Sequence, residues 1–216
     1  TLFAKYTLRA DEMFLNRMIG GTFEGSNDPD FREKEVLYLI NEKPKRLQTV
    51  VQSYSSKSYR YVRYIGPKDS HCNIAEAAFY TPNDTASLKG KVIGTPGCFQ
   101  KDGSHEYTNV FDGDVTTSFD YIEPSGGWSG LDLGTPKQIG RIVYTPRSYD
   151  NYIRSGDDYE LFYCARRNNW KSLGDQRSKA DSLIYIKIPV NALLLLCNNT
   201  RGIQERIFVY TAAEQI

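Results

Sequence analysis

The most informative stretch of this chain is Asn109-Val-Phe-Asp-Gly-Asp-Val-Thr-Thr-Ser-Phe119, which is followed by Gly130-Leu-Asp-Leu-Gly134 and by Pro146-Arg147. It places an acidic turn before a short apolar strand that stops at a glycine, and a second strand precedes the proline. Three oxygen-bearing side chains crowd around one glycine, as in a calcium loop. They are Asp112, Asp114 and Thr117. The same residues also suit a tight turn closed by side-chain-to-backbone hydrogen bonds, so both interpretations stand.

Short strand patterns dominate the rest of the chain. Residues 59–64 alternate aromatic or apolar residues with arginine, which predicts a half-exposed strand. Runs bounded by Gly, Pro or Asn turns predict further strands at 138–144, 158–163 and 182–188. Helical spacing of apolar residues occurs only over residues 10–18. Many short strands between Gly- and Pro-rich turns predict an all-β sandwich or jelly roll, and 16 tyrosines among 216 residues favour the same class.

A short internal repeat predicts two related β units. Cys72-Asn-Ile-Ala-Glu-Ala-Ala-Phe-Tyr-Thr81 is similar to Gly202-Ile-Gln-Glu-Arg-Ile-Phe-Val-Tyr-Thr211, and chance similarity of two closing strands is the alternative. We therefore expect a reduced β-sandwich-like unit over residues 1–84 and a β-sandwich over residues 91–216. Residues 85–90 are expected to be the linker, within a polar stretch punctuated by proline and glycine.

Composition excludes several classes of partner. Lys plus Arg number 27 against 26 Asp plus Glu, a net charge of +1, which gives no electrostatic reason to expect nucleic acid or an anionic membrane. The longest apolar run, Ala192–Cys197, is too short for membrane insertion. The chain does not begin with Met, and we interpret it as a fragment or a processed form.

The four cysteines do not predict a metal site. No Cys-x-x-Cys occurs and only two histidines are present, so zinc is not expected. Cys164 and Cys197 lie in strand-like runs and are expected to act as small buried hydrophobic residues. One disulfide remains possible, with no pairing favoured.

No catalytic residue is expected. The chain has no Gly-x-Ser-x-Gly elbow, phosphate loop or pair of metal-ligating histidines. His71 beside Cys72 is the only thiol–imidazole neighbour, and adjacency in sequence is not the geometry of a catalytic pair.

The loop over residues 146–156 is the predicted ligand-binding edge. It combines aromatic rings with planar hydrogen-bonding groups, which suit the apolar patch and the hydroxyls of a sugar. The predicted binding residues are Arg147, Tyr149, Asn151, Tyr152 and Arg154, joined by Tyr121 and Glu123 from the preceding loop. Alternatively, Arg147 pairs with a carboxylate such as Asp132 and the tyrosines simply pack.

The two tryptophans are expected to be structural. Alternation places Trp128 and Asp132 on one face of a strand, and core packing is favoured over sugar stacking for Trp128. Trp170 follows Arg-Arg-Asn-Asn and marks a hairpin.

The ordered motifs resemble a known family. Asp-Gly-Asp-x-x-Thr, then Asp-Leu-Gly, Pro-Arg, a Tyr-Glu-Leu strand and a Trp resemble the discoidin, or coagulation-factor F5/8 type C, domain, over roughly residues 90 to 212. Carbohydrate-binding modules of family 32 share its galactose-binding-like fold. The resemblance implies a galactose-binding-like β-sandwich (jelly roll), preceded here by a shorter related β unit. It also implies a structural Ca²⁺ held by Asp112, Asp114 and Thr117, with Glu205 at the position that completes the ligand shell.

The chain also departs from this family. A galactose-type site often places a histidine beside an arginine and an aromatic residue. In the second predicted unit only His105 could take that place.

The resemblance implies a location and a role. Arg-Tyr-Val-Arg-Tyr-Ile-Gly-Pro at residues 60–67 and Tyr-Glu-Leu-Phe-Tyr at 159–163 resemble surface or periplasmic proteins of gut Bacteroidetes, so an extracytoplasmic location is expected. The expected function is non-catalytic carbohydrate binding that targets a linked enzyme or a cell surface to glycan. Glycan and the other domains of a larger polypeptide are then the partners. Two alternatives are a structural or protein-interaction module without sugar binding, and a fragment of a hydrolase whose catalytic domain precedes Thr1.

Overall fold

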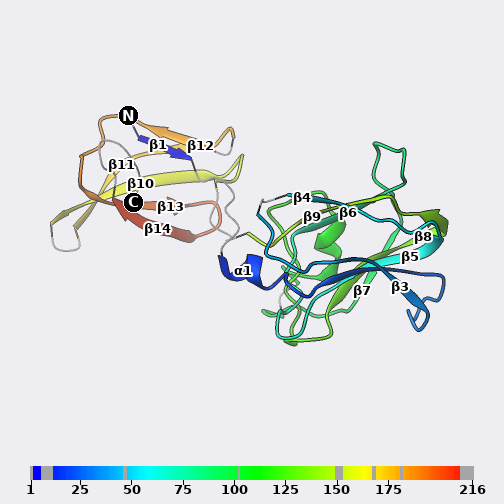
Figure 1. Ribbon diagram of the computed structural model, residues 1–216. Helices are drawn as coiled ribbons and strands as arrows, with labels where there is room; N and C mark the ends of the chain where they lie inside the picture. Colours follow the sequence, from blue (N-terminus) through cyan, green and yellow to red (C-terminus); the bar gives the residue numbers. More distant parts are fainter. Residues whose placement is uncertain are drawn as a thin grey trace. The chain divides into compact units, whose positions relative to one another are not determined.

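The computed structural model is nearly all-β and divides into two compact units (Figure 1). It describes residues 2–5, 12–45, 48–101, 103–148, 153–166, 169–180 and 182–209. Thr1–Arg9 and Tyr149–Ile216 form one unit, the split unit. Ala10–Ser148 form the other, the inserted unit, because the chain leaves the split unit to build it and then returns.

This division corrects the predicted boundaries at 84 and 91. Strands from both predicted units are paired within the same sheets, such as β5 (Ser58–Ile65) with β8 (Trp128–Gln138) and β6 (Glu76–Tyr80) with β9 (Arg141–Thr145). The predicted linker at 85–90 connects two strands of the inserted unit. Pairing between strands far apart in sequence leaves no local sequence pattern. The short repeat therefore predicted the wrong unit boundaries.

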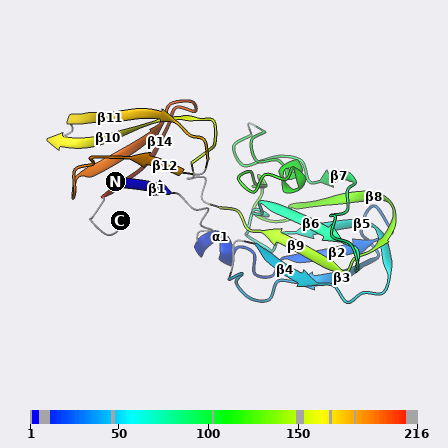
Figure 2. The ribbon, with the colours of Figure 1, turned by 90° about the horizontal axis from the view of Figure 1, so that it is seen from above.

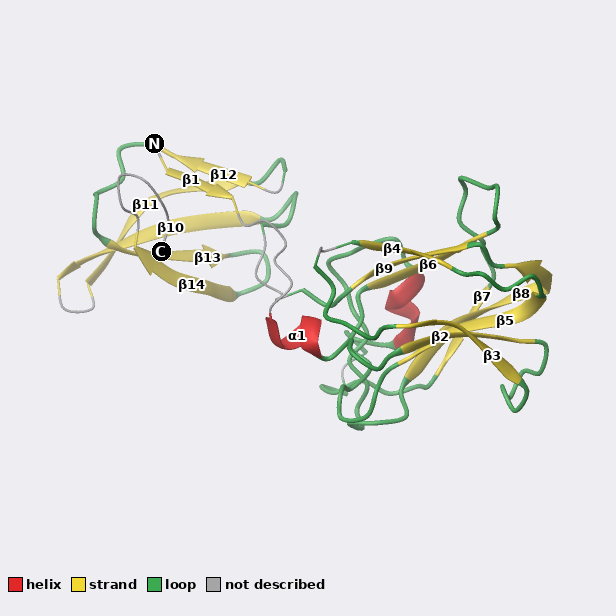
Figure 3. Ribbon diagram, in the orientation of Figure 1, coloured by secondary structure: helices red, strands yellow, loops and turns green. Residues whose placement is uncertain are grey.

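The inserted unit is a sandwich of two antiparallel sheets, drawn as two layers in Figure 3. The larger sheet has the order β3-β2-β5-β8-β7 and the smaller one β4-β9-β6. The remaining elements of this unit are β2 (Thr22–Ser26), β3 (Lys34–Leu39), β4 (Thr49–Gln52), β7 (Lys91–Gly94), the short helix α1 (Glu12–Asn16) and the 3₁₀ helix η1 (Tyr107–Phe111). The predicted all-β class is confirmed.

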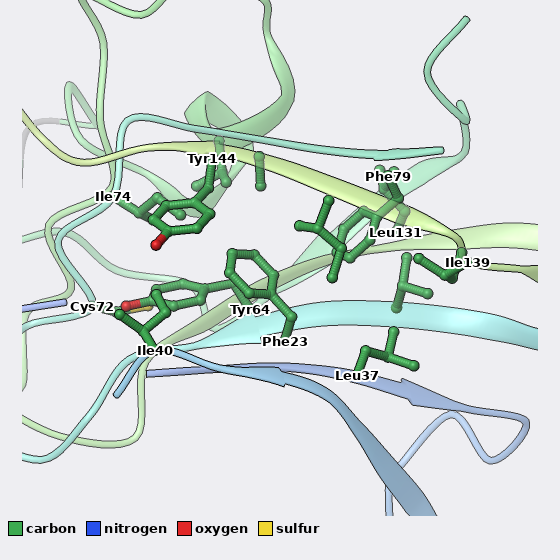
Figure 4. Close-up of a cluster of buried hydrophobic side chains, with 14 of the residues drawn as sticks. Phe23, Leu37, Ile40, Tyr64, Cys72, Ile74, Phe79, Leu131, Ile139 and Tyr144 are labelled. Atoms are coloured by element: carbon green, nitrogen blue, oxygen red, sulfur yellow. The ribbon is translucent and has the colours of Figure 1, made fainter. Parts of the chain in front are cut away.

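Aromatic side chains fill the space between these two sheets (Figure 4). The Phe23 ring from β2 lies 5.0 Å from Tyr64 of β5 and 5.3 Å from Tyr144 of β9, measured between ring centroids. All three side chains are almost fully buried. Gly21 is required beneath them, because a Cβ there would lie 2.5 Å from the Tyr64 hydroxyl. The aromatic layer therefore depends on a glycine just before β2.

The split unit has its own sheets and core. β10 (Asp158–Arg166), β11 (Asn169–Arg177), β13 (Leu193–Asn198) and β14 (Ile203–Val209) form a four-stranded sheet in the order β11-β10-β13-β14. The N-terminal β1 (Leu2–Lys5) pairs with β12 (Ser182–Tyr185), as Figure 2 shows. Tyr159, Leu161 and Leu194 are fully buried in the core of this unit.

Most predicted elements are present with altered bounds. The helix expected over 10–18 is the five-residue α1, and the strand expected over 138–144 is divided between the end of β8 and β9. β5 is present but is not half-exposed, because Arg63 on its outer face is only 8% exposed. The hairpin that carries Trp170 is confirmed by the pairing of β10 with β11.

The cysteines depart from expectation. Cys164 and Cys197 are half-buried, whereas Cys72 and Cys98 are buried. Within the described part of the chain, none of the four is joined in a disulfide. Cys164 and Cys197 lie on a sheet face that is only partly covered. Apolar neighbours in sequence therefore did not indicate how deeply these two cysteines are buried.

Candidate functional site

Loops gather at one end of the inserted unit. Ile65, the last residue of β5, lies opposite Trp128, the first of β8, so the loop after β5 and the loop before β8 leave the sheet together. The bridge between Ile74 and Phe119 joins these two loops. We call this region, residues 66–75 and 95–127, the loop end. Binding residues concentrate in such loops because a rigid sheet positions them.

A strained turn forms the centre of the loop end. Asp69, His71 and Cys72 have φ values of 60°, 53° and 51°, a left-handed conformation that non-glycine residues rarely adopt. The neighbouring loop holds them, with the Asp69 main-chain N–H donating to the Ser125 hydroxyl at 3.0 Å. His71 also donates its main-chain N–H to the Pro124 carbonyl at 3.0 Å. Backbone strain of this kind persists only where surrounding contacts enforce it, and it is common at binding sites.

His71 is fixed in orientation. Its Nδ1 lies 2.9 Å from the Tyr121 carbonyl oxygen, and the Tyr121 main-chain N–H donates back to the His71 carbonyl at 2.7 Å. A carbonyl oxygen can only accept, so Nδ1 carries the proton and Nε2 of the neutral ring is left as an acceptor. The Phe99 ring meets His71 edge-on, with centroids 6.0 Å apart, and is 60% exposed. An exposed aromatic face and an oriented imidazole therefore lie side by side.

Sequence reasoning missed this pair. His71 was considered only as a neighbour of Cys72, and Phe99 stands in Cys-Phe-Gln-Lys, which has no periodic pattern. Burial raises the pKa of the Cys72 thiol, so the thiol–imidazole neighbourhood is not reactive. Phe99 donates its main-chain N–H to the Asp120 carbonyl at 2.9 Å, and the next residue, Tyr121, is hydrogen-bonded to His71. No local signal could have indicated that contact.

Arg147 supports the loop end from beneath. It forms an ion pair with Asp120, and only 12% of its side chain is exposed. Asp120 also accepts from the Asn73 amide at 2.7 Å, and Asn73 in turn accepts from Arg17 at 2.5 Å. The guanidinium groups of Arg147 and Arg17 lie 4.9 and 5.9 Å from the Phe14 ring. This network ties α1 to the loops, and it leaves little of Arg147 for a ligand.

The alternative that Arg147 pairs with a carboxylate is confirmed, but the carboxylate is that of Asp120 and not of Asp132. Asp132 instead pairs with Arg60, at 2.8 Å, and this ion pair together with the Gly134 main-chain N–H lowers the pKa of Asp132 to about 2. Asp132 and Arg147 are not in contact, because Asp132 lies on the outer face of the larger sheet whereas Arg147 lies beneath the loop end.

The other predicted ligand-binding residues are dispersed. Tyr149, Asn151 and Tyr152 lie outside the described residues. Arg154 belongs to the split unit, where its main-chain N–H donates to the Tyr159 hydroxyl at 2.8 Å. Tyr121 lies at the loop end, half-buried behind His71, with its ring 5.9 Å from Phe119.

The predicted calcium loop is a tight turn closed by its own side chains. Asp112 accepts from the Asp114 main-chain N–H at 2.7 Å and from the Thr117 hydroxyl at 2.8 Å. Asp114 accepts from the Thr116 main-chain N–H at 2.9 Å. The turn interpretation is thus satisfied without any added ion.

Glu76 is the acidic side chain that reaches this loop. Its carboxyl accepts from the Gly113 main-chain N–H at 2.9 Å and is hydrogen-bonded to Asp112. Burial, and then this contact with Asp112, raises the pKa of Glu76 to about 8. Glu205, the predicted ligand, lies on β14 of the split unit, and its side chain is outside what the structure describes.

The oxygen donors at this loop suit Ca²⁺ in kind, since they are carboxyl, hydroxyl and carbonyl groups. They are incomplete in number: among the described residues, no group of three or more His, Cys, Asp or Glu side chains is arranged to hold a metal. Glu76 and Asp112 would supply two carboxylates, and the remaining ligands would have to be main-chain carbonyls and water.

Trp128 packs outside the main core, contrary to expectation. It is half-buried on the outer face of the larger sheet, with its ring 5.8 Å from Phe31. The Arg63 guanidinium lies 4.0 Å from the Phe31 ring and 5.2 Å from the Trp128 ring, and pairs with the buried Glu24 at 2.7 Å. This cluster is structural, because ring faces and charges are already engaged with one another.

Comparisons of the chain with protein-family models, with curated proteins and with solved structures give no match. No helix within the described ranges is long and apolar enough to cross a membrane.

Proposed function

We propose that this chain is a non-catalytic carbohydrate-binding module whose sugar site is the loop end of the inserted unit. One observation carries the proposal: the exposed Phe99 ring stands beside an oriented His71 on a strained turn. A pyranose ring presents an apolar C–H face that packs on an aromatic ring, and its hydroxyls need fixed donors and acceptors. The resemblance to discoidin domains supports the same class of function.

His71 is proposed to receive a sugar hydroxyl. With Nδ1–H committed to the Tyr121 carbonyl, Nε2 of the neutral ring is left to accept a hydrogen bond from that hydroxyl. Because this geometry is set before a ligand arrives, little conformational entropy is lost on binding. Of the residues predicted from sequence, Tyr121 holds His71 in place, whereas Arg147 has a supporting role through Asp120.

The proposed role of sugar binding is targeting. Through it, a linked enzyme or a cell surface outside the cytoplasm would be kept close to glycan, with the linked parts supplied by a larger polypeptide. Single contacts of this kind are weak, so a second module in the same polypeptide would raise the overall affinity.

A glycan-array screen of the intact chain tests the proposal, with Phe99→Ala and His71→Gln as the site variants. Tyr54→Ala is the matched control, since Tyr54 is 93% exposed in the loop between β4 and β5, at the opposite end of the sandwich. We expect the site variants to lose binding with unchanged thermal stability, and the control to bind like the parent. Failure of the folded chain to bind any glycan, or equal loss in the control, would sink the proposal.

Calcium is proposed as a structural ligand of the turn at 112–117. Asp112 and Glu76 would supply the carboxylates, with Glu76 taking the part first expected of Glu205, and main-chain carbonyls and water would complete the shell. Ca²⁺ that binds the folded form alone raises thermal stability. Addition of Ca²⁺ should therefore raise the Tm of the parent chain and not that of an Asp112→Asn/Glu76→Gln variant. If Ca²⁺ does not change the Tm of the parent chain, residues 112–117 form a turn that binds no calcium.

The alternative function is a structural or protein-interaction module without sugar binding. The split unit favours it, because several large apolar side chains there are more than half exposed. These are Ile184, Ile186, Val190 and Ile207. A partner protein that covers these side chains would remove their apolar surface from water. A glycan array without any signal, combined with co-purification of a specific partner, would favour this alternative.

A further inference from the structure

A groove is lined in part by the residues of the strained turn that come just before His71. It has a volume of about 510 Å³ and lies between the α1 region and the turn. Its apolar lining is Met13, Ile19 and Pro67. Its polar lining is Asn16, Arg17, Lys68, Asp69 and Ser70. Ser70 lines the groove and His71 directly follows it, so the same turn carries a groove residue and the histidine of the proposed sugar site.

Arg17 is held in place before any ligand arrives. Its Nη1 donates to the Asn73 side-chain oxygen at 2.5 Å, and its guanidinium lies 5.9 Å from the Phe14 ring. Asn73 is buried and anchored to Asp120. The guanidinium has five N–H donors in a planar fork, so anchoring through one nitrogen leaves further donors for a planar anion such as a carboxylate.

Lys68 is the second cation of the groove. It is exposed, and within the described part of the chain it forms no ion pair. The turn that carries it is fixed through the next residue, Asp69, whose N–H donates to Ser125. Asp69 is the one carboxylate in the lining, so the groove holds two cations against one anion. This balance differs from the near-neutral chain as a whole.

We propose that the glycan bound at the loop end contains a carboxylated sugar, a uronic acid, whose carboxylate is received by Arg17 and Lys68. This inference rests on the proposed function. The sugar ring lies against the apolar lining while an adjacent residue of the same glycan reaches Phe99. A carboxylate meets Arg17 as a charge-assisted hydrogen bond, which is about twice as strong as a neutral one.

The test compares acidic glycans with their methyl esters. Affinities for oligogalacturonate and oligoglucuronate trimers are measured by calorimetry beside those of the esters, which lose the charge of each carboxylate and add one methyl group to it. We expect the acids to bind roughly tenfold more tightly than the esters, as one charged hydrogen bond implies. The difference should shrink as salt is added. Equal affinity for acid and ester overturns the inference.

Lys68→Gln is the decisive variant, because an exposed lysine without an ion pair can be replaced without loss of folding. Lys137→Gln is its matched control, since Lys137 is also exposed and lies toward the far end of β8. Lys68→Gln should lower the affinity for the acids several-fold and leave the esters unchanged, whereas Lys137→Gln should change neither. Arg17→Gln should act in the same way, with its Tm measured because it also supports α1.

The outcomes separate the two proposals. Phe99-dependent binding of neutral glycans without preference for the acids keeps the proposed function and removes this inference, and so does an identical effect of Lys68→Gln and Lys137→Gln. Absence of binding to every neutral and acidic glycan removes both.

Discussion

At the residue scale, the space that neighbouring atoms leave free limits which side chain a position can carry. Gly130 on β8 has no side chain because Arg63 and the main chain of β5 occupy the space beside it. The absence of a Cβ there lets Arg63 lie between the rings of Phe31 and Trp128. Gly130, the first glycine of Gly-Leu-Asp-Leu-Gly, is thus required for close packing and not for a turn.

Gly130→Ala is expected to destabilise the inserted unit by about 1–3 kcal/mol, the usual cost of overpacking. The new Cβ would lie 2.3 Å from the Val62 carbonyl oxygen, an atom that cannot move without disturbing β5. Urea unfolding would measure the loss. Gly113→Ala is a poor control because its φ is 85°, so Thr135→Ala, at an exposed position of the same strand, serves instead. Equal stability of Gly130→Ala and the parent would contradict the packing argument.

Asp132 is expected to make stability sensitive to acid. Its pKa is lowered to about 2 by Arg60, whereas the ordinary value is 3.8. A lowered pKa means that the contribution is present above the ordinary value and is lost as the pH falls from about 4 toward 2. The free energy of unfolding should decline less steeply over this range in Asp132→Asn than in the parent. Parallel pH profiles would show that solvent screening cancels the effect.

At the element scale, the loop between β2 and β3 covers the outer face of the larger sheet. Phe31 adopts a φ of 54° and is only 3% exposed, so the loop turns its ring down onto Tyr61, Arg63 and Trp128. The buried pair of Arg63 and Glu24 lies beneath it, and Lys34 also reaches Glu24 at 2.9 Å. A sheet face that alternation marks as exposed is covered by a strained loop.

Arg63→Met is expected to cost about 3 kcal/mol, because it leaves Glu24 buried with Lys34 as its remaining partner. The double variant Arg63→Met/Glu24→Gln should recover part of that loss, since no buried charge is left and Lys34 is partly exposed to solvent. Denaturant unfolding measures both. Lys57→Met is the control: it breaks the exposed pair with Glu35 and should cost under about 1 kcal/mol. A similar cost for the two single variants would contradict burial as the cause.

At the scale of the whole molecule, one unit is continuous in sequence and the other is not. The inserted unit contains both of its sheets and its core within Ala10–Ser148. The split unit needs β1, which comes from the opposite end of the chain, to pair with β12. The two units therefore differ in whether a simple fragment contains all their strands.

Residues 10–148 expressed alone are expected to unfold cooperatively, with near-UV circular dichroism typical of packed aromatic rings. Residues 149–216 alone should be markedly less stable, because β12 loses its only partner strand among the described residues. Joining residues 1–9 to residue 149 through a short Gly/Ser linker should restore stability. A stable 149–216 fragment, or a 10–148 fragment without a thermal transition, would contradict the division.

The sequence alone determined the all-β class and the positions of several strands. Alternation in residues 59–64 and the apolar run at 192–197 are local patterns, and they correspond to β5 and β13. The acidic turn at 112–117 was also predictable, because Asx-type hydrogen bonds form between residues close in sequence.

Tertiary structure decided the rest. That β5 pairs with β8, that Glu76 and not a residue near the C-terminus reaches Asp112 within the described side chains, and that Phe99 stands beside His71 all depend on contacts between distant segments. The sequence pattern of a strand indicates that it must pair with another strand, but it does not indicate which one. Pairing of strands across the whole chain therefore set both the unit boundaries and the candidate site.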